Sequence, residues 1–223
     1  MVCAIILAGG SSSRMNGINK QLADLCGIPV VVRSALAFQS SDKVSEIILA
    51  VPDGEEEKYR ALCLSHGVTK LKAAVCGGST RFLSVRNCLR RVSEECTNIA
   101  VHDGARPLIK TADIDRVLSD AYKYDASIAA APVTDTIKQC SGAEVSCTPD
   151  RSTLYSAQTP QAFSRELYLS CAEKLGAAAE TLTDDSALLE LCGIPVHITP
   201  VTACNMKITR PEDLAIAQAV LRR

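Results

Sequence analysis

Short, continuous apolar runs alternate along this chain with segments of helical apolar spacing. The apolar runs cover residues 2–7, 46–51, 71–75, 98–101, 128–133 and 196–201. Helical spacing falls between them, at residues 29–39, 55–65, 80–95 and 112–123. A strand that is buried on both faces is apolar along its whole length, and parallel strands are joined by crossovers that are usually helices. We therefore predict an α/β fold with a mainly parallel, twisted sheet and helices on both faces.

The length and composition agree with a single domain over residues 1–223. The chain is 47% hydrophobic but only 4% aromatic, which favours an α/β core over an all-β one. Its formal net charge of −1 excludes the broad basic surface of a nucleic-acid-binding protein, so any anion site must be local. The N-terminus has no signal-like segment, and no apolar stretch approaches membrane-spanning length. We expect a cytoplasmic protein that binds neither nucleic acid nor a membrane.

Eleven cysteines are an unusually high number for such a chain. No two of them form a C-x-x-C pair, so the spacing typical of zinc sites is absent. Most lie among Ala, Leu and Val, where a free cysteine acts as a small buried hydrophobic residue. Disulfides or a metal site are the alternatives, and we predict reduced thiols of a cytoplasmic protein.

One polar stretch, residues 135–158, interrupts the alternation. Residues 137–140 and 144–148 flank Ser141-Gly142 and could pair as a hairpin. Because a long structureless loop is uncommon inside a compact domain, we predict a projecting β-arm over residues 135–158. Near the end of the chain, residues 209–212 (TRPE) predict a capping box at the start of a C-terminal helix.

The first apolar run ends in small residues that are followed by two isolated cations. Gly9 and Gly10 precede three serines, and Arg14 and Lys20 follow. Small residues after a strand let backbone N–H groups surround an anion, and the cations would neutralise it. The stretch matches neither a P-loop nor a dinucleotide fingerprint, and an ordinary flexible connection is the alternative.

Other strand ends carry polar groups of the same kind. They are residues 76–81 (CGGSTR), 102–107 (HDGARP), 132–136 (PVTDT) and 205–209 (NMKIT). Asp103 could hold a metal ion with its phosphate, or it could simply pair with Arg106. In open α/β sheets ligands bind beyond the carboxyl ends of the strands, so we predict a phosphate-binding site at this edge.

Taken in order, these motifs resemble those of the 2-C-methyl-D-erythritol 4-phosphate cytidylyltransferase family. The matching stretches are LAGG-SSS-RM, KQ, GG-STR, HDGARP, PVTDTIK, DR, QTPQ, TDD and NMKITRPED, and they span essentially the whole chain. The first loop is shared by many sugar-nucleotide transferases, whereas HDGARP, the DTIK arm and KITRPED are specific. The resemblance implies a Rossmann-like nucleotide-diphospho-sugar transferase fold. It also implies a homodimer in which each β-arm reaches into the partner.

The resemblance further implies the reaction. CTP and 2-C-methyl-D-erythritol 4-phosphate, a polyol phosphate, would give 4-CDP-2-C-methyl-D-erythritol and pyrophosphate in non-mevalonate isoprenoid biosynthesis, with Mg²⁺ or another divalent cation. A phosphate oxygen of the acceptor attacks the α-phosphorus of CTP and needs no general base, so none of the three histidines has to titrate. Catalysis then consists of positioning and of neutralising charge.

Roles for individual residues follow from the same resemblance. The expected catalytic cations are Arg14, Lys20 and Lys207. Nucleotide binding falls to Ala8, Gly9 and Gly10, and to a cytosine-reading turn with Gly78, Ser79 and Ser84. Asp103 is the expected metal ligand and also contacts substrate, together with Arg106, Thr136, Arg151, Thr159 and Thr183. Of these, Thr136 and Arg151 would act from the arm of the other subunit.

Several alternatives share part of this pattern. A ribitol-5-phosphate cytidylyltransferase carries nearly all of these motifs and differs in the acceptor. A guanylyl- or uridylyltransferase shares the first loop but would not carry HDGARP with the DTIK arm. A non-catalytic nucleotide-binding module would be expected to lose Asp103 or Lys207, and both are present. A dehydrogenase is disfavoured because the dinucleotide fingerprint is missing.

Overall fold

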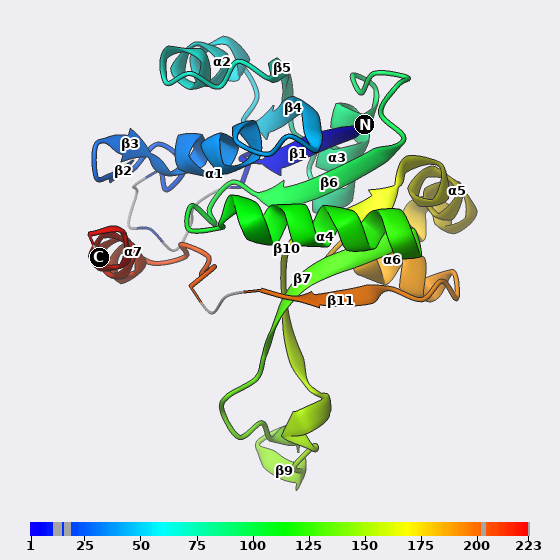
Figure 1. Ribbon diagram of the computed structural model, residues 1–223. Helices are drawn as coiled ribbons and strands as arrows, with labels where there is room; N and C mark the ends of the chain where they lie inside the picture. Colours follow the sequence, from blue (N-terminus) through cyan, green and yellow to red (C-terminus); the bar gives the residue numbers. More distant parts are fainter. Residues whose placement is uncertain (11–14, 16–18, 202–203, 223) are drawn as a thin grey trace.

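The computed structural model describes residues 1–10, 15, 19–201 and 204–222, so Arg14 lies outside the described residues. A seven-stranded sheet in the order β11-β7-β10-β6-β1-β4-β5 forms its centre (Figure 1). The strands are β1 (Val2–Leu7), β4 (Val44–Val51), β5 (Leu71–Cys76), β6 (Asn98–Asp103), β7 (Ala126–Pro132), β10 (Tyr155–Ser164) and β11 (His197–Pro200). β10 runs antiparallel to β6 and β7, and the other neighbours are parallel. The predicted mainly parallel sheet is confirmed.

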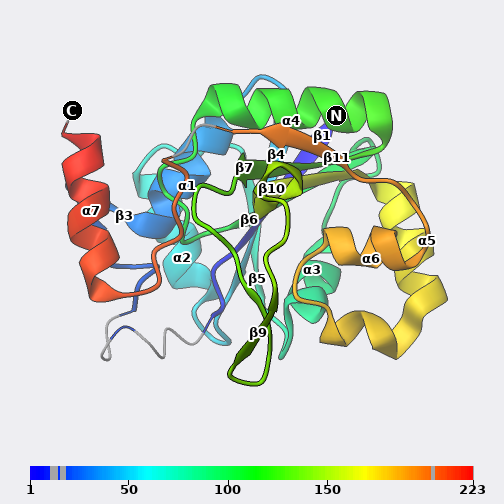
Figure 2. The same ribbon diagram turned by 90° about the horizontal axis from the view of Figure 1, so that it is seen from below.

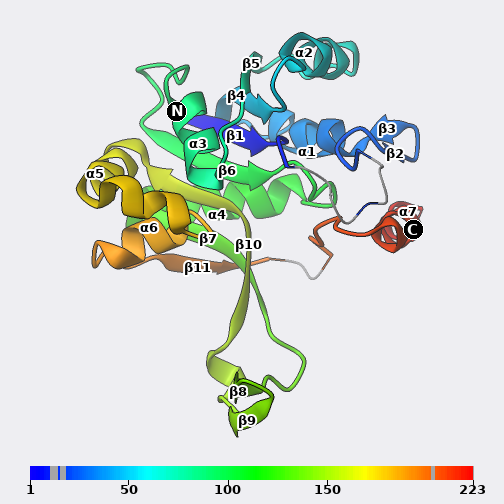
Figure 3. The same cartoon turned by 180° about the vertical axis from the view of Figure 1, so that it is seen from behind.

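Helices cover both faces of the sheet. One face carries α1 (Val30–Gln39), α2 (Glu56–Ser65) and α4 (Thr111–Tyr124), and the other, seen from behind in Figure 3, carries α3 (Arg81–Leu89), α5 (Arg165–Leu175) and α6 (Ser186–Leu191). The C-terminal helix α7 (Pro211–Leu221) packs beside a small ribbon of β2 (Asp24–Leu25) and β3 (Ile28–Pro29). None of the helices in the described part of the chain combines the length and the apolar character needed to cross a bilayer.

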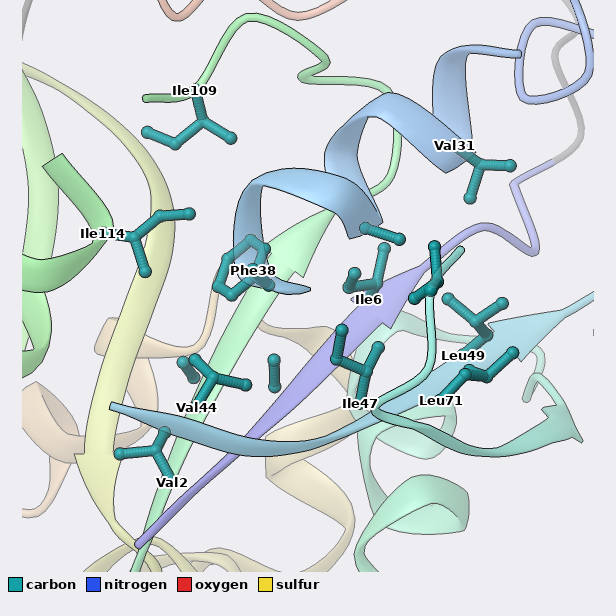
Figure 4. Close-up of a cluster of buried hydrophobic side chains, with 14 of the residues drawn as sticks. Val2, Ile6, Val31, Phe38, Val44, Ile47, Leu49, Leu71, Ile109 and Ile114 are labelled. Atoms are coloured by element: carbon teal, nitrogen blue, oxygen red, sulfur yellow. The ribbon is translucent and has the colours of Figure 1, made fainter. Parts of the chain in front are cut away.

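Strand periodicity divides the interior into two cores. Along β1, Val2, Ala4 and Ile6 point to the face of α1 and α4, where Phe38 and Ile114 also lie (Figure 4). The intervening residues of β1 join the core beneath α3 and α5. Complete burial of one such aliphatic side chain contributes about 1.5–3 kcal/mol. The two cores therefore hold the carboxyl edge of the sheet, where the predicted site residues lie, on a rigid support.

A β-arm projects from the sheet, as Figures 1 and 2 show. It contains the hairpin of β8 (Gln139–Ser141) and β9 (Glu144–Cys147) and the short 3₁₀ helix η1 (Arg151–Thr153). Every residue of the hairpin strands is exposed. The expected hairpin is thus present and stands away from both cores, although its first strand is Gln139–Ser141 rather than residues 137–140, so that Ser141 pairs with Glu144 instead of lying in the turn.

Other local details also differ from the sequence-based expectations. β10 begins at Tyr155, so the last four residues of the expected arm belong to a central strand. Helix α3 ends at Leu89 rather than near residue 95. Helix α7 begins at Pro211, and its capping carboxylate is Asp213, which accepts hydrogen bonds from the N–H groups of Thr209 and Arg210 at 2.7 and 2.9 Å. The carboxylate lies one residue beyond the predicted box because the helix starts later than expected.

Candidate active site

A pocket of about 400 Å³ lies beyond the carboxyl ends of β1, β5 and β6. Its described lining comes from the loop after β1, the turn before α3, the end of β6 and the segment before α7. Eight of the predicted site residues are among the lining: Gly9, Gly10, Lys20, Gly78, Ser79, Ser84, Asp103 and Lys207. Segments far apart in the sequence therefore meet where a parallel α/β sheet binds its ligands.

Asp103, at the end of β6, is the acidic residue of this lining among the described residues. Its carboxylate pairs with three cations: Arg81 at 2.7 Å, Lys207 at 2.9 Å and Arg106 at 3.3 Å. Burial alone would raise the pKa of the Asp103 carboxyl, but the charges of Arg81 and Lys207, with Arg106, hold that pKa well below its ordinary value. Asp103 is therefore ionised at neutral pH and organises the positive charge of the pocket.

The turn between β5 and α3 presents backbone to the pocket. The N–H of Gly78 donates to Ser84 Oγ at 2.9 Å, and the N–H of Leu83 donates to Thr80 Oγ1 at 3.2 Å, which caps α3. A Cβ atom on Gly78 would lie 2.3 Å from Leu83 Cβ, so the turn closes onto the helix only with glycine at this position. The turn is thus held in one conformation by its own side chains.

Behind Asp103 lies a buried polar pair, His102 and Thr159. The N–H of Asp103 donates to Thr159 Oγ1 at 3.0 Å, and the same oxygen lies 3.0 Å from His102 Nδ1. Burial lowers the pKa of His102 to about 3. His102 is therefore neutral at physiological pH, which suits a reaction without a histidine base.

The remaining predicted residues lie outside the described lining of the pocket. Ala8 is buried, and its N–H donates to Ala50 O at 2.7 Å. Arg106 reaches the site through Asp103, and Thr159 lies behind it. The other three are exposed, on the arm or on the loop before α6: Thr136, Arg151 and Thr183. Their contacts with substrate, and the role of Arg14, remain predictions.

Sequence reasoning assigned no role to Arg81 and Asp185. The guanidinium of Arg81 bridges two carboxylates, donating to Asp103 Oδ1 at 2.7 Å and to Asp185 Oδ2 at 2.8 Å. Asp185 also accepts a hydrogen bond from the hydroxyl of Tyr168 at 3.1 Å. Arg81 belongs to the motif GG-STR and Asp185 to the motif TDD. The sequence therefore marked both stretches as parts of the site, but it did not show which residue of each motif contacts Asp103 or Arg81.

Comparisons with known proteins agree with this geometry. A model of the family 2-C-methyl-D-erythritol 4-phosphate cytidylyltransferase matches residues 2–223. Curated proteins of that name from Geobacillus kaustophilus and Syntrophus aciditrophicus are each 38% identical to this chain, over 98% and 100% of it and 96% of each relative. A solved structure of 4-diphosphocytidyl-2C-methyl-D-erythritol synthase from Anaerococcus prevotii superimposes with a TM-score of 0.88 at 29% identity, covering 100% of this chain and 98% of the other. The chain therefore belongs to the 2-C-methyl-D-erythritol 4-phosphate cytidylyltransferase family.

Proposed function

We propose that the pocket around Asp103 is where this cytidylyltransferase joins CTP and 2-C-methyl-D-erythritol 4-phosphate to give 4-CDP-2-C-methyl-D-erythritol and pyrophosphate. One observation carries the proposal: Arg81, Arg106 and Lys207 gather on one carboxylate beside glycine-rich turns. Such a site offers backbone N–H groups and cations to two anionic substrates.

The charges suggest how the residues act. Lys207 is the most exposed of the three cations, with 40% of its side chain accessible, whereas Arg81 and Arg106 are 20% and 13% accessible. Lys207 can therefore turn from Asp103 to the α-phosphate, while both arginines keep the carboxylate in place. The acceptor's phosphate oxygen then attacks the α-phosphorus, and pyrophosphate leaves in line. The fixed cations stabilise the charge that develops.

A divalent cation fits this pocket in one way. Mg²⁺ prefers oxygen ligands and is usually held by one or two carboxylates together with substrate phosphates. Among the described lining residues Asp103 offers that single carboxylate, and its Oδ2 atom would keep the Arg106 contact at 3.3 Å but lose the Lys207 contact at 2.9 Å when Lys207 moves to the triphosphate. The ion would supply charge neutralisation on the triphosphate, as Mg²⁺ does in related phosphoryl transfers.

We also propose a homodimer in which the arms are exchanged. The arm and its root expose three large apolar side chains, Ile137, Val145 and Tyr155, which a partner surface would cover. Thr136 and Arg151 lie on the same projecting arm, outside the described lining of this chain's own pocket. An arm that binds ligand across a two-fold axis would explain both features.

We also propose that the protein works in the cytoplasm, and the free cysteines support this proposal, including the exposed Cys26, Cys140, Cys147 and Cys204. Unpaired, accessible thiols are typical of a reducing compartment.

The proposed activity is tested by measuring pyrophosphate release with each of the four ribonucleoside triphosphates and with two acceptors. We expect rapid release with CTP and methylerythritol phosphate, and slow release with UTP, ATP or GTP. Ribitol 5-phosphate as the faster acceptor would replace the proposed substrate, and equal turnover of UTP and CTP would contradict the assigned base.

A further inference from the structure

Three segments meet behind the Asp103 carboxylate, and each contributes one buried polar side chain that is not part of the described pocket lining. The first is the end of β6 with its turn, from His102 to Arg106. The second is Thr159 on β10, and the third is Asn205, which precedes Lys207 by two residues. His102, Thr159 and Asn205 are 0%, 4% and 1% exposed. We refer to these three side chains as the buried joint.

The hydrogen bonds around His102 allow one arrangement of protons. The carbonyl of Arg106, 3.3 Å from His102 Nε2, can only accept, so Nε2 carries the proton. In a neutral imidazole Nδ1 is then an acceptor, and the Thr159 hydroxyl donates to it. The oxygen of that hydroxyl in turn accepts from the Asp103 N–H. The chain of bonds thus fixes both ends of the Asp103–Arg106 turn.

Asn205 extends the joint to the other two segments. Its side-chain amide donates to the Thr159 carbonyl and to Gln158 Oε1, each at 2.9 Å. Its backbone carbonyl accepts from Arg106 Nη1 at 2.8 Å. Residues 158 and 159 lie on the strand that leads out of the arm, so one buried residue connects the root of the arm through its side chain and Arg106 through its backbone carbonyl to the segment of Lys207.

We propose that His102, Thr159 and Asn205 are positioning residues for cytidylyl transfer, which hold Asp103, Arg106 and Lys207 in register without touching substrate. This inference rests on the proposed function of the pocket. It differs from the role that family resemblance implies for Thr159, because a hydroxyl that donates its proton to His102 and accepts from the Asp103 N–H has no proton left to donate to the acceptor's phosphate.

The variants Thr159→Val and Thr159→Ser test whether Thr159 positions Asp103 or contacts the acceptor directly. Valine keeps the shape and removes both hydrogen bonds, whereas serine keeps the hydroxyl. We expect Thr159→Val to lower kcat at least 30-fold and Thr159→Ser to stay within threefold of the wild type. In an Asp103→Glu background, where the carboxylate is already displaced, Thr159→Val should cost less than threefold, because Thr159 acts through Asp103.

Thr199→Val is the matched control for losing a buried threonine hydroxyl. Thr199 is 3% exposed on β11 and its hydroxyl donates to Asp120 at 2.6 Å, outside the described pocket lining. We expect this control to lower Tm comparably and to leave kcat unchanged. If Thr159→Val does not fold, His102→Gln replaces it, because the amide can still donate to the Arg106 carbonyl but offers no acceptor at the Nδ1 position.

Three results would overturn the inference while the wild type remains active. They are unchanged kcat in the variant, an equal loss in the wild-type and Asp103→Glu backgrounds, or a rise in the KM of the acceptor alone. The last result would instead mark Thr159 as a direct substrate contact. A wild-type protein that releases no pyrophosphate from CTP overturns the proposed function itself.

Discussion

Asp103 and Lys207 show at the scale of single residues how the pocket balances its charges. Asp103 is shielded by two partly buried arginines, so its charge is neutralised even when Lys207 leaves. The Lys207 ammonium is bound to the same carboxylate, but 40% of the Lys207 side chain remains accessible. Lys207 can therefore move from Asp103 to a substrate phosphate, and the buried Asp103 carboxylate stays paired with Arg81 and Arg106.

Lys207→Met should therefore affect turnover more than folding. The loss of a charge-assisted contact that strengthens in the transition state costs about 2–4 kcal/mol, which corresponds to a fall in kcat of roughly 30- to 1,000-fold. Tm should change little, because Asp103 retains Arg81 and Arg106. Lys174→Met, at an exposed position on α5, is the control. Near-normal kcat in Lys207→Met would remove this residue from the catalytic machinery.

The variant Gly78→Ala tests whether CTP binding depends on the shape of the turn between β5 and α3. A methyl group there would lie 2.3 Å from Leu83 Cβ and 2.8 Å from Leu83 C, so the turn must move in Gly78→Ala. Overpacking of this kind costs about 1–3 kcal/mol. We expect the KM for CTP to rise at least tenfold. Gly77→Ala meets its nearest atoms at 3.3 Å and should have a smaller effect, and equal KM values for both variants would contradict this account.

At the scale of elements, the continuous apolar runs predicted six of the seven central strands. β10 escaped prediction because Pro160 and several polar residues stand where a central strand is usually apolar. The structure accommodates Pro160 where the register between β10 and β7 shifts, between Ala157 and Gln161, and the ladder needs no donor there. The sequence around Pro160 could not predict this strand, because the shift in register depends on pairing with β7, which is a separate segment of the chain.

The side chain of Glu46, on β4, links this strand to Lys72 on β5 and to Ser93 after α3. The variant Glu46→Gln tests how much these contacts stabilise the fold. The carboxylate accepts from the N–H and hydroxyl of Ser93 at 2.9 and 2.6 Å and pairs with Lys72 at 3.0 Å. Burial would raise the pKa of Glu46, but these hydrogen bonds lower it below the ordinary value of 4.5. Glu46→Gln should lose about 1.5–3 kcal/mol of unfolding free energy at pH 7.

The contribution of Glu46 to the free energy of unfolding should depend on pH in a definite direction. Because the folded-state pKa lies below the unfolded one, the stabilisation is complete above about pH 4.5 and is lost as pH falls through the folded-state pKa. The difference between the wild type and Glu46→Gln should therefore shrink in acid, as followed by urea unfolding. Glu57→Gln, whose side chain is 81% exposed, should track the wild type, and a constant difference for Glu46→Gln would refute the assignment.

At the scale of the whole molecule, the sequence motifs predicted which segments converge but not how each side chain is used. The turns after β1, β5 and β6 and the segment of Lys207 meet as expected. Arg81 as the bridge between Asp103 and Asp185, and Thr159 behind Asp103, emerge only when β10 and α3 are placed in space. Three-dimensional neighbours decide which member of a polar motif faces the pocket.

Mixing two inactive variants tests the exchange of arms. Arg151→Ala removes an arm residue and Lys207→Ala removes a core residue. In an exchanged heterodimer the wild-type Arg151 arm would meet the wild-type Lys207 pocket, so one of the two sites should regain activity. Verified heterodimers without activity would show that each pocket uses its own arm.

The reaction proposed for the Asp103 pocket begins when a phosphate oxygen of the acceptor attacks the α-phosphorus of CTP. Methylerythritol phosphate carrying ¹⁸O in all phosphate oxygens tests it directly by mass spectrometry of the products. We expect every labelled oxygen to stay in 4-CDP-2-C-methyl-D-erythritol and the released pyrophosphate to be unlabelled, with both products formed roughly 30- to 1,000-fold more slowly in Lys207→Met. Label in the pyrophosphate would contradict this mechanism.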